Sequence, residues 1–119
     1  MDLIPIYDDT NPIACTATAA EISVRLDQVD RMRANLAGIE RTPHGVLLHF
    51  PDRDDIDAEL RQFTVDEQRC CEFWGFDIQR DATGLHLRWD GPPSVNQFFD
   101  ELVEYFQGDE PITAFSGLL

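Results

Sequence analysis

The chain has 119 residues, of which 43% are hydrophobic, and its 23 acidic and 9 basic residues give a formal net charge of −14. This length and composition predict one folded domain and exclude a disordered acidic tail, while the charge argues against direct binding of a nucleic acid, whose phosphates it would repel. No apolar run approaches the roughly 20 residues of a membrane span, and the N-terminus lacks the basic and apolar segments of a signal peptide, so we expect a cytoplasmic protein with no membrane contact.

The first half of the chain reads as an extended arm, a helix and a β-hairpin. Residues 1–14 contain two prolines and are expected to be extended. Thr18-Ala-Ala-Glu21 is a capping-box pattern, which predicts a helix that runs to about Ala37 and ends before a glycine. Residues 39–42 and 45–50 are then two predicted strands joined by a tight turn.

The second half repeats this layout without close sequence identity. Residues 54–73 carry apolar side chains at steps of three and four, which predicts a second helix. Residues 76–80 and 85–89 alternate apolar and polar side chains, as half-buried strands do. A second capping-box pattern, Ser94-Val-Asn-Gln97, begins a third predicted helix that stops at Gly108. The order αββαββα predicts an α+β fold, in which helices cover one face of a four-stranded antiparallel sheet.

Residues 109–119 form a tail with no predicted element of its own. The tail carries Ile112, Phe115, Leu118 and Leu119, and an exposed apolar segment of this kind usually marks a contact surface. Two alternatives stay open: the tail folds back over its own sheet, or it contributes to a homodimer interface. A dimer of such acidic subunits should be favoured by high salt, which screens their mutual repulsion.

One stretch departs from an ordinary amphipathic pattern, at the end of the second predicted helix. Its apolar stripe includes Phe63, Cys70 and Trp74, and Glu67 lies on the same stripe. A carboxylate among apolar side chains costs free energy unless it has a proton, a hydrogen-bond partner or a cation. We therefore expect Glu67 to be buried and to have a chemical role beside the thiols of Cys70 and Cys71.

The chain has 3 cysteines, and this odd number favours free thiols over a disulfide framework. Adjacent cysteines on a helix point about 100° apart, and their Cα atoms are too close for an ordinary disulfide. Cys15 precedes the first predicted helix, whose dipole favours a thiolate there. If Cys15 lies near Cys70 and Cys71, the three sulfurs and Glu67 form a donor set that selects Hg(II), Cu(I), Zn(II) or arsenite.

Three functions are compatible with these residues. The leading hypothesis is a cytosolic binding protein for a thiophilic metal or metalloid, with Cys15, Cys70 and Cys71 as ligands. Glu67 would be a fourth ligand or a base beside them. The first alternative is a thiol-dependent enzyme, for redox chemistry or for protonolysis of a carbon–metal bond with Glu67 as the acid. The second is a structural or interaction module, because free cysteines also pack as small buried hydrophobes.

The histidines are expected to be unrelated to this site. His44 falls in a turn, whereas His49 and His86 fall in strands. His49 alternates out of phase with its apolar neighbours, and His86 shares a strand face with Arg88, so we expect both to face solvent. No Gly-rich phosphate loop, Ser-His-Asp order or His-based zinc motif is present in the sequence.

The pattern of cysteines resembles that of a known family. Ile13-Ala-Cys15-Thr, followed by Glu67-Gln-Arg-Cys-Cys-Glu-Phe73 and then Gly84-Leu-His-Leu, resembles a small bacterial family with the pattern (I/V)-x-C-T/S … E-x-x-C-C-x-F. Members of that family often accompany, or are fused to, mercury-resistance-type (MerR) regulators. The resemblance covers residues 13–106 and implies that Cys15, Glu67, Cys70 and Cys71 are the shared positions.

Overall fold

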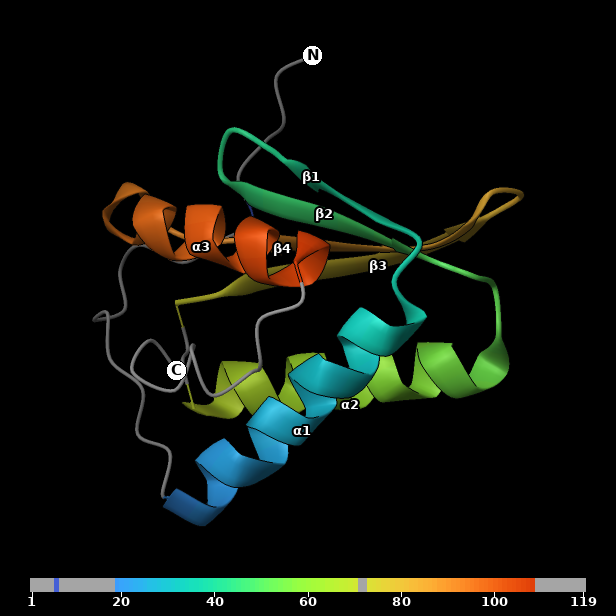
Figure 1. Ribbon diagram of the computed structural model, residues 1–119, viewed down its shortest axis with the longest axis horizontal. Coiled ribbons are helices and arrows are strands. Elements are labelled where there is room, and N and C mark those ends of the chain that lie inside the picture. Colours follow the sequence, from blue (N-terminus) through green and yellow to red (C-terminus); the bar gives the residue numbers. More distant parts are fainter. Residues whose placement is uncertain (1–5, 7–18, 71–72, 109–119) are drawn as a thin grey trace.

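The computed structural model describes residue 6 and residues 19–70 and 73–108. The predictions for Cys15, Cys71, nearly all of the N-terminal arm and the tail 109–119 lie outside these residues. The described helices are α1 (Ala19–Asn35), α2 (Asp54–Cys70) and α3 (Asn96–Gln107), shown in Figure 1. The strands are β1 (Gly38–Arg41), β2 (Gly45–Phe50), β3 (Gly75–Asp81) and β4 (Gly84–Asp90).

The four strands form one antiparallel sheet in the order β1-β2-β4-β3, which confirms the predicted α+β fold. Each predicted hairpin is present, and the two hairpins join through the central strands β2 and β4. The register of this central pair places His49 directly opposite His86. Because successive side chains on a strand point to opposite faces, both histidines lie on the same face of the sheet.

The helices pack against the other face of the sheet, where the hydrophobic core lies. Six side chains of the central strands point into this core, and each is at most 1% exposed: Val46, Leu48, Phe50, Leu85, Leu87 and Trp89. They form one cluster with buried side chains from α1, α2 and α3. In the part of the chain that the structure describes, no helix is long and apolar enough to cross a membrane.

Trp89 lies at the centre of an aromatic core. Its ring centroid lies 5.3–6.0 Å from those of five other aromatic side chains: Phe63, Trp74, Phe76, Phe98 and Phe99. Aromatic pairs at such distances contribute about 0.5–1.5 kcal/mol each beyond the burial of their area. The aromatic residues of α2, α3 and the strands therefore fix the end of α2 against the sheet.

The second helix does not include Phe73, where the sequence pattern predicts its end. The described part of α2 ends at Cys70, and Phe73 lies in a turn before β3. The side-chain amide of Gln68 donates a hydrogen bond of 3.2 Å to the backbone carbonyl of Trp74, so this carbonyl has a partner within the protein. The apolar stripe extends to Trp74 because the turn returns its ring to the core, where it is 5% exposed.

The predicted capping box at the third helix is absent. Pro93–Val95 forms a 3-10 turn, α3 begins at Asn96, and Val95 at its N-cap makes no side-chain hydrogen bond. The physical reason is the Pro92–Pro93 pair, whose fixed φ begins the turn ahead of Ser94. Ser94 therefore lies within the turn and not at the N-cap.

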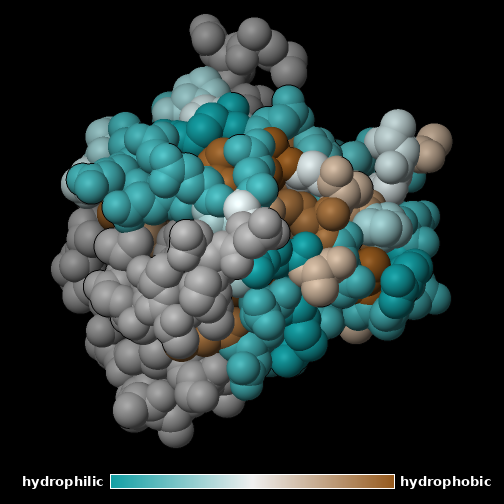
Figure 2. All heavy atoms as spheres, viewed as in Figure 1, coloured by the Kyte–Doolittle hydropathy of each residue, from teal (hydrophilic) through white to brown (hydrophobic). Residues whose placement is uncertain are grey.

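Among the described residues, the face seen in Figure 2 is largely hydrophilic, with smaller hydrophobic areas among the hydrophilic ones. Val65 of α2 is a large hydrophobic side chain that is 60% exposed. Single exposed apolar side chains are ordinary on folded proteins and do not by themselves mark an interface. Buried polar groups are therefore the better indicators of function in this molecule.

Candidate functional site

Glu67 is buried in the last turns of α2. Its side chain is 3% exposed, and the apolar residues that precede it on the same stripe, Ile56, Leu60 and Phe63, are at most 2% exposed. The predicted burial of this carboxylate is thus confirmed. Removing a carboxylate from water is costly, so a sequence retains one in the core only where it has partners or a role.

The indole of Trp74 is one partner of this carboxylate. Its Nε1–H donates to Glu67 Oε1 at 3.1 Å, and the contact is buried. The indole is itself fixed by other rings, with centroids 4.4 Å from Phe73 and 5.5 Å from Phe99. A rigid aromatic wall therefore holds Glu67 in one orientation through a hydrogen bond from a neutral donor.

Cys70 is the final residue of α2, three positions after Glu67. Residues three apart are neighbours on one face of a helix, so the fold brings these two positions into the same turn. Cys15 and Cys71 lie outside the described residues, and the predicted proximity of the three thiols stays a prediction. Among the side chains that the structure describes, which do not include those of the three cysteines, no three His, Cys, Asp or Glu side chains are grouped to hold a metal ion.

The electrostatics at this end of α2 favour cations. The last carbonyl groups of a helix carry about half a negative charge, and α2 has Arg69 in its last turn. Arg69 lies 3.7 Å from Asp66, which also accepts a hydrogen bond of 2.9 Å from Gln28 of α1. The negative end of the helix dipole stabilises positive charge, and Arg69 supplies that charge in the last turn of α2.

A second polar centre lies on the sheet face away from the helices. His49 Nδ1 and His86 Nδ1 are 2.7 Å apart, and the two rings meet edge to face at 77°. The side chains are 28% and 17% exposed, so the expectation that both simply face solvent misses their pairing. The alternation of apolar and polar residues placed both histidines on the correct face of the sheet. Only the β2–β4 register could have revealed that the two rings are in contact.

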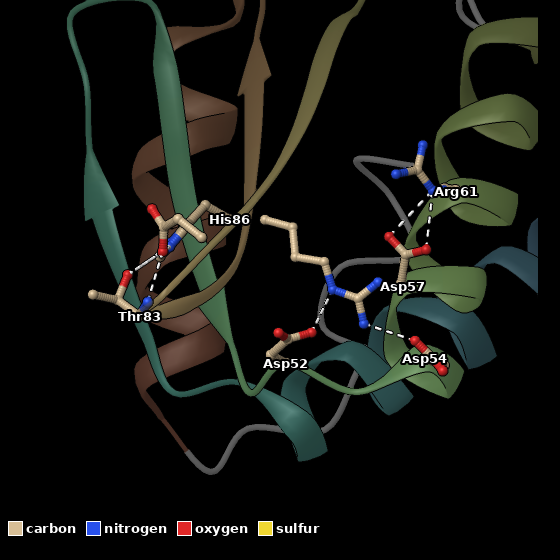
Figure 3. A network of polar contacts seen from close by, with 8 residues as sticks. Asp52, Asp54, Asp57, Arg61, Thr83 and His86 are labelled. Atoms are coloured by element: carbon tan, nitrogen blue, oxygen red, sulfur yellow. Dashed lines mark hydrogen bonds and ion pairs between the residues drawn. The ribbon is translucent and has the colours of Figure 1, made fainter.

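Each histidine of this pair is held from its outer side by a carboxylate. His49 Nε2 lies 2.6 Å from Glu40 Oε2, and His86 Nε2 lies 3.0 Å from Asp81 Oδ1. Thr83 contacts both His86 and Asp81 at the β3–β4 turn. Figure 3 shows Thr83 beside His86. The hydroxyl of Thr83, followed by the imidazole of His86, holds the pKa of Asp81 well below its usual range.

A hollow of about 400 Å³ lies over this pair, and its lining includes His49, His86, Gln79 and Arg88. Arg88 is engaged with Asp90 at 2.7 Å, and Asp90 is completely buried. Asp90 also accepts a hydrogen bond of 3.2 Å from the backbone amide of Ile6. The open face of the sheet is thus a polar, ordered surface, with both imidazoles at the hollow.

Comparison with known proteins gives no match to this chain. No family model matches it, and neither does any curated protein or any solved structure.

Proposed function

We propose that this is a cytosolic protein that binds a thiophilic metal or metalloid ion of the Hg(II), Cu(I), Zn(II) or arsenite class at the end of α2. Cys15, Cys70 and Cys71 supply thiolate ligands, and Glu67 is a fourth ligand or a base that accepts the thiol protons. Soft sulfur donors select this class of ion over Mg²⁺ or Ca²⁺.

The observation that carries the proposal is the position of Glu67. It is a carboxylate at 3% exposure, oriented by an indole N–H and one helical turn from Cys70. Thiols must lose their protons to bind a metal, and a nearby carboxylate can accept a proton or complete the coordination. The negative end of the α2 dipole gives further support, because it stabilises a cation.

The test is competition for Hg(II) between the protein and excess glutathione. Several thiolates held together bind one ion with a high effective concentration, so the folded protein should retain one Hg(II) per chain. Cys15→Ser, Cys70→Ser and Cys71→Ser should each release the ion to glutathione. If the native protein loses Hg(II) as readily as these variants do, the thiols do not form a common site.

The role of the carboxylate has its own variant and a matched control. Glu67→Gln keeps the shape and removes the charge, so we expect Hg(II) to be lost at a lower glutathione concentration. Glu59→Gln makes the same change on the same helix, at a residue that pairs with Arg31 on the surface at 2.8 Å. Equal retention of Hg(II) by the two variants would exclude a chemical role for Glu67.

A further inference from the structure

The contact between His49 and His86 has an unusual arrangement of protons. Both outer nitrogens, the Nε2 atoms, face acceptors: Glu40 for His49, and Asp81 with Thr83 for His86. The Thr83 hydroxyl donates to Asp81 Oδ1 at 2.6 Å, which leaves its oxygen as an acceptor for His86 Nε2–H at 2.9 Å. An ionised carboxylate accepts and does not donate, so each ring carries its proton on Nε2.

The two inner nitrogens therefore direct lone pairs toward the same point. A neutral imidazole with a proton on Nε2 has only an acceptor at Nδ1, and these acceptors lie 2.7 Å apart. Two facing acceptors require a positive centre between them, which is either one shared proton or a metal cation. Metal-binding histidines are typically oriented in this way, with the second ring nitrogen donating to a carboxylate or another oxygen acceptor.

We propose that His49 Nδ1 and His86 Nδ1 bind a divalent first-row transition metal ion, of the class Co²⁺, Ni²⁺, Cu²⁺ or Zn²⁺. Imidazole nitrogen is a suitable ligand for these ions and a poor one for Mg²⁺ or Ca²⁺. This site lies on the open sheet face and does not depend on the thiols.

The geometry needs a small adjustment to accept the ion. Zinc–nitrogen bonds of about 2.0–2.1 Å at a tetrahedral angle place the two nitrogens roughly 3.3 Å apart, so the pair must open by about 0.6 Å. The two part-exposed rings can open by rotating toward the hollow of about 400 Å³, where water molecules would supply the remaining ligands. Glu40 and Asp81 offset the added charge, and Arg88, the cation in the lining, is paired with Asp90.

Titration of the reduced full-length protein with Ni²⁺, followed by imidazole NMR signals and by calorimetry, tests the site. We expect one Ni²⁺ to broaden the His49 and His86 signals, and His49→Gln or His86→Gln to weaken binding at least about tenfold. Glu40→Gln should weaken it roughly tenfold as well, because the imidazole loses its charged partner. His44→Gln is the matched control, and it should bind Ni²⁺ as the native protein does.

Three results would overturn the proposal. The native protein could fail to bind Ni²⁺, or both variants of the pair could bind it with native affinity. The third is a loss of Ni²⁺ affinity in His44→Gln that equals the loss in the His49 and His86 variants. Circular dichroism of each variant checks that the chain is still folded when Ni²⁺ binding is lost. Glu40→Gln is a further variant that leaves both imidazole rings in place.

Discussion

The end of α2 and the open sheet face hold their ionisable side chains in two different ways. At the end of α2, a carboxylate at 3% exposure is held by a neutral indole N–H within an aromatic core. On the sheet face, two histidines at 28% and 17% exposure are each held by a carboxylate that is mostly in solvent. The first arrangement is coupled to the stability of the core, whereas the second can change with little effect on the fold.

Trp74→Phe should show the larger effect, because it removes the indole N–H that orients Glu67. A buried acceptor that loses a donor costs about 1–3 kcal/mol of unfolding free energy beyond the cost of a smaller ring. Trp89→Phe measures the cost of the smaller ring, since the buried Trp89 Nε1 has no hydrogen-bond partner among the residues that the structure describes. Urea unfolding of both variants gives the difference, and equal losses would mean that the Trp74–Glu67 bond contributes no stability.

The histidine pair should matter much less to stability. His86→Gln removes a part-exposed contact between polar groups, so the free energy of unfolding should fall by about 1 kcal/mol or less. Urea unfolding under the conditions used for Trp74→Phe is the measurement. A loss as large as that of Trp74→Phe would show that the open face is as tightly coupled to the core as the end of α2 is.

The smallest expected effect concerns Asp81. Its pKa is depressed in the folded state, first by the Thr83 hydroxyl and then by His86. The ionised carboxylate therefore stabilises the fold above the usual Asp pKa, and this contribution is lost as the pH falls through the lowered value. Thr83→Ala should raise the pKa toward the usual range, which an NMR titration of the carboxyl carbon measures. An unchanged titration would show that Thr83 does not lower the pKa of Asp81.

Most of the fold followed from local patterns. The alternation in residues 76–80 and 85–89 predicted two strands, and the apolar stripe predicted α2 and the burial of Glu67. The end of α2 before Phe73 was not predictable, because Trp74 continues the apolar stripe from outside the helix. Local patterns describe which side chains are buried, and they do not specify how the chain brings them there.

The histidine pair illustrates a second limit of sequence reasoning. His49 and His86 were correctly assigned to the polar sides of their strands, but their contact depends on the register between β2 and β4. That register arises from packing across the sheet, and residues 37 positions apart carry no local signal of it. The proximity of Cys15 to Cys70 stays a prediction because Cys15 lies outside the described residues.

X-ray absorption at the zinc edge, on protein loaded with one Zn(II) per chain, tests the central claim most directly. Zinc–sulfur bonds are about 2.3 Å and zinc–nitrogen bonds about 2.0–2.1 Å, so the two regions give distinct coordination shells. We predict a shell with three sulfurs and one lighter ligand, and the loss of a sulfur in Cys15→Ser. A shell of nitrogen and oxygen alone would place the ion away from the thiols and contradict the proposed function.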